Sequence, residues 1–306
     1  MESLPDCWPL AGMSLPGTHN SATWDRSSLC TALAIKHCCL CQNKYINEQL
    51  EAGIRVFDIR PSFNNHEHLY LWHDSIKLGG ITLSDVLGIF TDYLLKYPSE
   101  TVLLMFKCHW ERKYCGEEFV ALFKAKVILF NYIWPNLFYS SPFDNPDDDK
   151  FKKSPLLGEV RGKIVFANQM YNDPVQTCIP SLVNFEGAKI ENNWKFEEEN
   201  EYLAELFSHI AKAKLNLTEP KCGDGRFWVT WLSANNCHRL GWGPRAIADR
   251  VNLFFRRKLI QYRQSIYRTS GIIMMDFPPK NLINHIIAEN YDIMLRNNKL
   301  GIENCK

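Results

Sequence analysis

Short apolar runs alternate along this 306-residue chain with longer segments of helical periodicity. The runs are short enough for buried strands, and most are apolar throughout, which is typical of parallel strands covered on both faces. They cover residues 53–59, 69–72, 101–106, 163–167, 226–232 and 271–275. This alternation predicts an α/β fold, either an open doubly wound sheet or a barrel.

Three of the intervening segments carry helix signals. Thr82 and Asp85 form a capping-box-like pair at the start of the first helix, and Pro98 ends it. A second helix has one apolar face, which we expect to consist of Ile247, Val251, Phe254 and Leu259. A third follows Pro279, with Leu282, Ile283, Ile286 and Ile287 toward the core.

Composition and motifs exclude several classes of function. The G-x-G-x-x-G and G-K-[ST] phosphate-binding patterns are missing, so nucleotide-binding versions of the fold are disfavoured. Lys and Arg number 35 against 34 Asp and Glu, and this balance argues against a nucleic-acid-binding surface. Hydrophobic residues make up 46% of the chain, enough for a sizeable core, so disorder is excluded as the main state.

The chain has no obvious membrane span or signal peptide. Its longest apolar run, residues 127–139, is interrupted by Asn131, Pro135 and Asn136, and the first ten residues lack the charged-then-apolar pattern of a leader. Eleven cysteines, an odd number, favour a reducing compartment. We therefore expect a cytoplasmic protein that is soluble or peripherally bound to a membrane.

The polar stretch 140–153 is the one plausible internal break. Because the strand–helix alternation resumes directly after it, we interpret this stretch as a loop. We therefore expect residues 1–306 to form a single domain, with a core from about residue 10 to residue 290.

Polar side chains follow the predicted strands. His19 and Asn20 come after the run 15–18, and Asp58 and Arg60 end the next one; His73, Lys107 and Asp276 end three others. Because the active site of a parallel α/β fold lies at the carboxyl ends of its strands, we expect these side chains to converge.

This set of residue types suits phosphodiester chemistry. Two imidazoles can divide proton transfer, and a carboxylate beside one of them fixes its tautomer. Arg60 and Lys107 supply fixed positive charge for an anionic centre. A metal fits less well, because Arg60 stands where a second carboxylate would be needed, and Asp58 and Asp276 alone provide few ligands.

Several blocks of the sequence resemble the catalytic X domain of phosphatidylinositol-specific phospholipase C. The most specific are SLPGTHNS at 14–21, QLEAGIRVFDIR at 49–60 and the pair Trp72-His73. Weaker blocks follow in the right order at 98–107, 161–166, 231–234, 244–252 and 271–277. The resemblance therefore extends over most of the chain.

The resemblance implies a distorted TIM-type (β/α) barrel that cleaves phosphatidylinositol, or a glycosylated inositol lipid, to diacylglycerol and inositol cyclic phosphate. It makes His19 the general base, Asp276 its orienting partner and His73 the general acid. Arg60 takes the place of a calcium ion, with Asp58 beside it. This pattern is similar to the metal-independent, bacterial-type branch, so the resemblance implies no cofactor, and calcium is not expected.

The resemblance also suggests contacts to substrate. Asn20, Lys107, Ser233 and Gln169 match positions that would line the substrate. Asn20 departs from the bacterial pattern, which usually has Asp there, and Gln169 follows a strand after which those enzymes carry a basic head-group contact. Phosphorylated inositol lipids therefore stay open as substrates too.

Two other functions stay open. One is a metal-dependent glycerophosphodiesterase on a related barrel; the other, suggested by Asn20, is an inositol-lipid-binding module that has lost catalysis. The expected partner is a phosphoinositide lipid at a membrane surface, with no nucleic acid and no protein partner inferable. Trp24 and Trp242 could contact the bilayer interface or pack in the protein. A structural zinc at Cys38–Cys41 is disfavoured because no second cysteine pair has the matching spacing.

Overall fold

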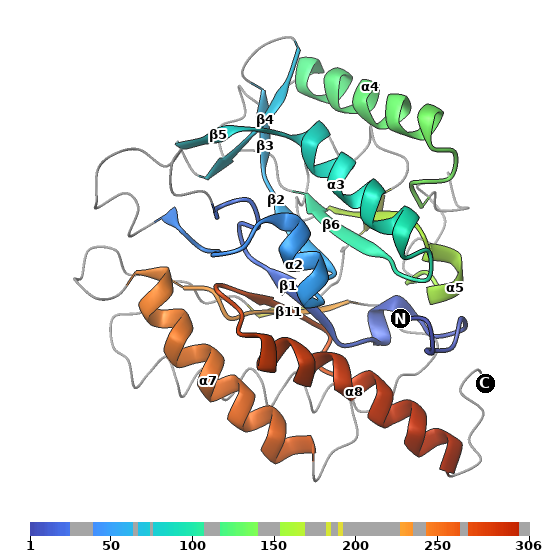
Figure 1. The fold of residues 1–306 in the computed structure, drawn as a ribbon, viewed down its shortest axis with the longest axis vertical. Coiled ribbons are helices and arrows are strands. Elements are labelled where there is room, and N and C mark those ends of the chain that lie inside the picture. Colours follow the sequence, from blue (N-terminus) through green and yellow to red (C-terminus); the bar gives the residue numbers. More distant parts are fainter. Residues whose placement is uncertain are drawn as a thin grey trace.

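A computed structural model describes residues 1–24, 39–63, 67–73, 76–106, 117–139, 154–168, 182–184, 189–191, 227–234, 243–263 and 269–299 (Figure 1). Its main sheet has eight strands in the order β8-β7-β6-β2-β1-β11-β10-β9. They are β1 (Leu15–Thr18), β2 (Val56–Ile59), β6 (Val102–Phe106), β7 (Ile164–Asn168), β8 (Leu182–Asn184), β9 (Lys189–Glu191), β10 (Trp228–Trp231) and β11 (Ile272–Met275). Every pairing in this sheet is parallel, which confirms the α/β prediction.

The strand order is that of a barrel rather than of a doubly wound sheet. The parallel strands follow one another in chain order, and the last, β11, pairs with the first, β1, from Leu15–Ile272 to Thr18–Met275. The remaining neighbours in a closed barrel would be β8 and β9, between which no pairing occurs in the described residues. The wall is therefore a distorted eight-stranded barrel with a seam at that point.

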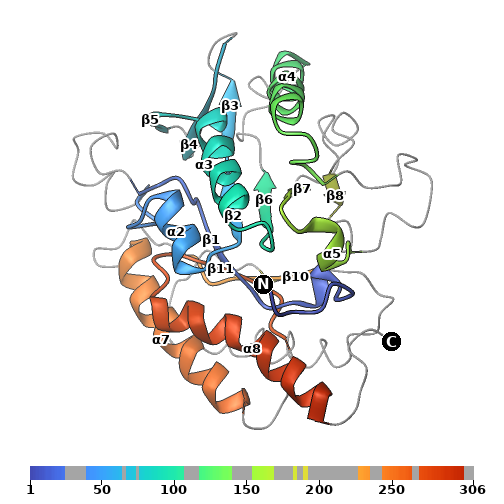
Figure 2. The same ribbon diagram turned by 45° about the vertical axis from the view of Figure 1, so that its right-hand side comes forward.

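Successive side chains along each strand belong to two different hydrophobic cores, one outside the barrel wall and one inside it. Phe57, Leu104 and Ile273 point outward and join the buried side of the helices. The helices lie around the outside of the sheet (Figure 2). The helices are α2 (Ile46–Ala52), α3 (Leu83–Lys96), α4 (Glu117–Ile133), α5 (Leu157–Val160), α7 (Pro244–Arg263) and α8 (Lys280–Lys299). Val56 and Met274 point inward, together with the apolar residues of the N-terminal segment.

Residues 1–13 lie at the amino-terminal end of the barrel. Leu10 lies in the short 3-10 helix η1 (Leu10–Gly12) and its backbone N–H donates to the carbonyl of Pro155, while Leu157 N–H donates to the carbonyl of Trp8. Leu10 and Trp8 are both buried in the inner core. The opposite, carboxyl end of the strands carries the polar side chains.

The three predicted helices are present, and one residue of a predicted apolar face differs. The capping box of α3 is present, because Thr82 Oγ1 accepts from Asp85 N–H at 3.2 Å and Thr82 N–H donates to Asp85 Oδ2 at 2.8 Å. In α7 the fully buried aromatic residue is Phe255, whereas the predicted Phe254 is only partly buried. Phe255 lies four residues from both Val251 and Leu259, so it continues their stripe along the helix.

The run 69–72 is not a strand of the parallel sheet, which corrects the prediction. It forms β4 (Leu69–His73) in a separate antiparallel sheet with β3 (Pro61–Phe63) and β5 (Ile76–Thr82). Buried Leu69 and Leu71 alternate with half-buried Tyr70 and Trp72. That alternation is the pattern of an antiparallel sheet with one covered face.

None of the helices in the described part of the chain combines the length and the apolar character that a membrane-spanning helix requires.

Candidate active site

Three neighbouring strands bring the predicted catalytic residues to one end of the barrel. His19 follows β1, Asp58 lies within β2 and Asp276 follows β11. Thr18 is in register with both Met275 and Phe57, so the three positions reach the same height on the sheet. They also continue the inward-facing alternation of Val56 and Met274, which directs their side chains toward the barrel axis.

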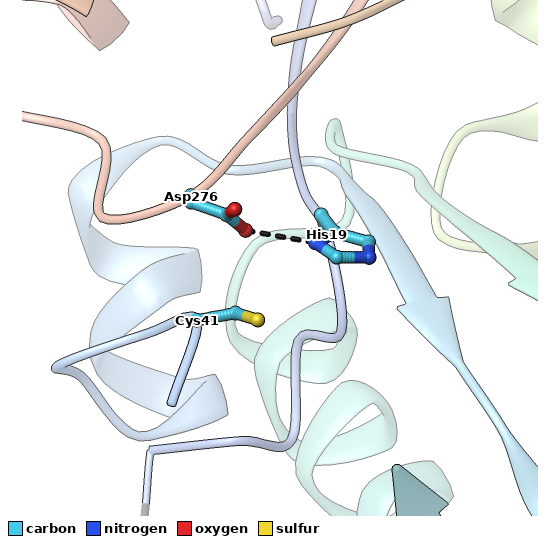
Figure 3. A group of neighbouring side chains, drawn as sticks. All are labelled: His19, Cys41 and Asp276. Carbon is cyan, nitrogen blue, oxygen red and sulfur yellow. Dashed lines mark hydrogen bonds and ion pairs between the residues drawn. The ribbon is translucent and has the colours of Figure 1, made fainter. Parts of the chain in front are cut away.

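His19 and Asp276 form a hydrogen-bonded pair (Figure 3). His19 Nδ1 lies 2.8 Å from Asp276 Oδ1, and Asp276 is only 1% exposed. Burial raises the pKa of Asp276, although the neighbouring His19 acts in the opposite direction. Asn252 Nδ2 donates to the backbone carbonyl of Asp276 at 2.9 Å, and the Trp231 ring meets the imidazole edge-on at 5.6 Å. These contacts fix both members of the pair.

Asn20 contacts the other nitrogen of the imidazole. Its Nδ2 lies 3.0 Å from His19 Nε2, which makes Nε2 an acceptor and places the ring proton on Nδ1, facing Asp276. Asn20 has a left-handed backbone, with φ of 43°, and its N–H donates to Asp58 Oδ2 at 3.0 Å. Its own Oδ1 is buried without a hydrogen-bond partner among the described residues.

Asp58 and Arg60 form the second charged pair. The guanidinium donates from Nε to Asp58 Oδ1 at 3.2 Å and from Nη2 to Oδ2 at 2.8 Å. Burial alone would raise the pKa of Asp58, but the charges of Arg60 and His19 outweigh it, so that this pKa is lowered. A fixed cation therefore lies at this end of the barrel, held by a buried carboxylate.

His73 belongs to the antiparallel sheet, next to the backbone of Arg60. It is the last residue of β4 and is 6% exposed. The N–H of the preceding residue, Trp72, donates to the carbonyl of Arg60 at 3.0 Å. His73 therefore directly follows the residue whose backbone is hydrogen-bonded to Arg60. The expectation that His73 ends a parallel strand is wrong, because β2 continues through Arg60 into β3, with which β4 pairs.

Only some of the other residues predicted to contact substrate or membrane lie in the described part of the chain. Ser233 is buried two residues after β10, and the ring of Trp24 packs against that of Tyr45 in a tilted pair, with centroids 3.7 Å apart. Lys107, Gln169 and Trp242 lie outside the described residues.

The sequence reasoning missed Cys41 and Gln42. Gln42 Nε2 donates to the carbonyls of His19 and Met275, at 2.7 and 3.0 Å, so this segment joins the ends of β1 and β11. The buried thiol of Cys41 lies close to Asp276 and donates to the backbone carbonyl of Cys39 at 3.7 Å, and burial raises its pKa well above the usual range. The C-x-x-C spacing drew attention to Cys41 as a metal ligand, but no local pattern showed which strands this loop would meet.

His19, Cys41 and Asp276 together have the donor types of a zinc site. Their ligand atoms lie within 4.8 Å of one another (Figure 3). A metal ion there would have to remove the thiol proton and replace the hydrogen bond between His19 and Asp276. It would therefore compete with the acid–base pair rather than assist it.

A family model for the phosphatidylinositol-specific phospholipase C X domain matches residues 13–170, just over half of the chain. The chain belongs to this family. The matched segment of the X domain contains His19, Asp58, Arg60 and His73, and the pairing of β11 with β1 adds Asp276 from outside it.

Similar proteins agree with this assignment. A 1-phosphatidylinositol phosphodiesterase of Listeria monocytogenes is 28% identical over 303 residues, which are 95% of this chain and 84% of that protein. The human PI-PLC X domain-containing protein 2 is 30% identical over 119 residues, or 32% of this chain and 38% of its own length. The solved phosphatidylinositol-specific phospholipase C of Listeria monocytogenes superposes with a TM-score of 0.72 at 24% identity, covering 94% of this chain and 97% of that one. The X-domain fold is thus shared along nearly the whole chain.

Proposed function

We propose that this protein is a phosphatidylinositol phosphodiesterase that releases diacylglycerol and an inositol cyclic phosphate without a metal ion. The observation that carries the proposal is the His19–Asp276 pair at the carboxyl end of an X-domain barrel. The Listeria relative that covers most of the chain is named a 1-phosphatidylinositol phosphodiesterase.

In this mechanism His19 is the general base. Nδ1–H is held by Asp276, so the lone pair of Nε2 is directed away from that carboxylate. The inositol 2-hydroxyl replaces the Asn20 amide at Nε2 and gives up its proton as its oxygen attacks phosphorus. Asp276 stabilises the imidazolium that results. The buried Oδ1 of Asn20, which has no partner in the described residues, supports a substrate contact through a ring hydroxyl.

His73 and Arg60 complete the step. His73 donates a proton to the glycerol oxygen as the phosphorus–oxygen bond to glycerol breaks, giving diacylglycerol and the cyclic phosphodiester. Arg60 stabilises the phosphoryl oxygens, and the Asp58 carboxylate holds the guanidinium in place. Ser233, Lys107 and Gln169 are proposed to line the inositol ring.

The proposal needs no divalent ion. Both carboxylates described at this end of the barrel have basic partners, since Asp58 binds Arg60 and Asp276 binds His19. This pairing supports the metal-independent reaction over the metal-dependent glycerophosphodiesterase.

One observation favours a second candidate, a lipid-binding module that does not turn over. The amide of Asn20 occupies the nitrogen of His19 that has to accept the proton. If this amide cannot be displaced by substrate, the barrel binds inositol lipid without cleaving it.

We propose that the enzyme works as a peripheral protein at a membrane surface, where its lipid substrate lies. The cytoplasmic location stays a prediction from the cysteine content. Cys41 is a free thiol, but Cys7 is disulfide-bonded, which a reducing compartment does not favour.

The test uses vesicles of phosphatidylcholine that contain phosphatidylinositol, with excess chelator present. We expect release of water-soluble phosphorus from phosphatidylinositol, and none from vesicles of phosphatidylcholine alone. Loss of turnover in chelator, restored by a divalent ion, would favour the metal-dependent alternative. Vesicle binding without release would favour the lipid-binding module.

A further inference from the structure

A cavity lies beside the catalytic end of the barrel. Its volume is about 450 Å³. It is bounded by the segment before α2, one face of α7 and the turn that leads into α8. Asn252 connects it to the active site, because this side chain lines the cavity and donates to the backbone carbonyl of Asp276.

The charge of the cavity wall is strongly positive. Four basic side chains line it, Lys44, Arg245, Arg256 and Lys280, against a single acidic one, Asp249. Asp249 is paired with Arg245 at 3.2 Å. The first turns of α7 and α8 also contribute to the wall, with Arg245 and Lys280, and the N-terminal ends of helices favour anions. The wall is therefore suited to a negatively charged ligand.

Two buried polar atoms of the lining residues lack a hydrogen-bond partner among the described residues. They are Oδ1 of Asn252, whose side chain is 3% exposed, and Nε of Arg256. A buried polar group without a partner costs free energy, so such atoms call for an explanation. One is an acceptor of the kind that hydroxyl groups bind, and the other is a charged donor of the kind that binds phosphate oxygens. Both atoms are closed to solvent in the free protein, so side chains of the wall have to shift for a ligand to reach them.

We propose that this cavity binds the phosphate of a polyol-phosphate head group, with a neighbouring hydroxyl reaching Asn252. The ligand is the head group of a second, non-reacting anionic lipid in the same membrane. This inference rests on the proposed function insofar as it places the enzyme on a lipid surface. The site anchors the barrel next to its substrate and is separate from the His19–Asp276 pair.

Neighbouring arginines on α7 provide a matched pair of variants. Arg256 lines the cavity, whereas Arg257 is exposed on the same helix and does not line it. Arg256→Gln and Arg257→Gln remove the same charge from adjacent positions. A non-specific attraction to an anionic surface would be weakened equally by both, since it depends on charge near the surface rather than on hydrogen bonds.

The experiment measures binding to vesicles of phosphatidylcholine with and without phosphatidylglycerol, which supplies a polyol phosphate but no inositol. We expect Arg256→Gln to weaken binding to the phosphatidylglycerol vesicles about tenfold or more, and Arg257→Gln to change it less than about threefold. Binding to pure phosphatidylcholine vesicles should be the same for all three proteins. Equal losses in the two variants, or no loss in either, would overturn the proposal.

A second arm distinguishes the source of the phosphate. Soluble glycerol 3-phosphate is titrated into the protein without vesicles. Weak binding that Arg256→Gln removes supports the proposed chemistry, provided that the vesicles bind more tightly. If glycerol 3-phosphate binds the wild type while phosphatidylglycerol vesicles do not, the lipid as ligand is overturned. Neither arm requires turnover, so failure here is distinguishable from failure of the phosphodiesterase assignment.

Discussion

Asp58 accepts two hydrogen bonds from the guanidinium of Arg60, one on each carboxylate oxygen. The same carboxylate accepts a third from the backbone N–H of Asn20, next to the proposed general base. The cation for the phosphate and the base for the hydroxyl are thus positioned by one buried side chain.

Arg60→Lys tests the role of the guanidinium. A lysine cannot reproduce two parallel hydrogen bonds to Asp58 while contacting a phosphate, so we expect kcat/KM to fall by about a hundredfold, or about 3 kcal/mol of transition-state stabilisation. Initial rates on phosphatidylinositol vesicles measure this loss. Arg257→Lys, at an exposed position on α7 outside the cavity, serves as the control for the same chemical change. A kinetically silent Arg60→Lys would remove Arg60 from the mechanism.

Asp58→Asn tests the buried pair through stability. The pKa of Asp58 is lowered in the fold, so its ionised form stabilises the protein above its unfolded-state pKa, and this contribution is lost as pH falls through the folded-state pKa. Breaking a buried pair costs about 3–5 kcal/mol at neutral pH. Urea unfolding at neutral and acid pH should therefore show a gap between wild type and variant that narrows on acidification. A gap independent of pH would contradict this assignment.

Gly17→Ala tests the packing of the barrel interior. A Cβ at this position would lie 2.4 Å from Met274 Sδ and 3.0 Å from Val56 Cβ, so the Met274 side chain would have to shift and β2 at Val56 would have to give by a few tenths of an ångström. We expect a loss of about 1–3 kcal/mol in the free energy of unfolding. Gly88→Ala in α3 is the matched control, because nothing lies within 4 Å of the added Cβ and alanine favours a helix by about 1 kcal/mol. Equal thermal stability of Gly17→Ala and wild type would contradict the described packing.

The sequence was sufficient to predict the features that local patterns determine. Apolar runs ending in His19, Asp58 and Asp276 predicted three strands whose polar ends meet, and the register of β1 with β2 and β11 confirms that arrangement. The capping pair at Thr82 likewise marked the start of α3 correctly.

Features that depend on contacts between distant segments were not predicted. Buried and half-buried side chains alternate in β4, but four large apolar or aromatic residues in a row also fit a fully buried parallel strand. The sequence pattern therefore assigns His73 to the wrong sheet. The loop at Cys41 and Gln42 has no periodicity, and its contacts are to residues far along the chain. The cationic cavity likewise combines α7 with the residues before α2 and α8, which no spacing in one segment reveals.

Phosphorus NMR of the products from phosphatidylinositol, in chelator, tests the central claim most directly. We predict that the wild type produces inositol cyclic phosphate, and that His19→Ala and His73→Ala each slow its appearance by about 10²–10⁴-fold while remaining folded. Near-wild-type production of cyclic phosphate by either variant, or the absence of this product with the wild type, would contradict the account.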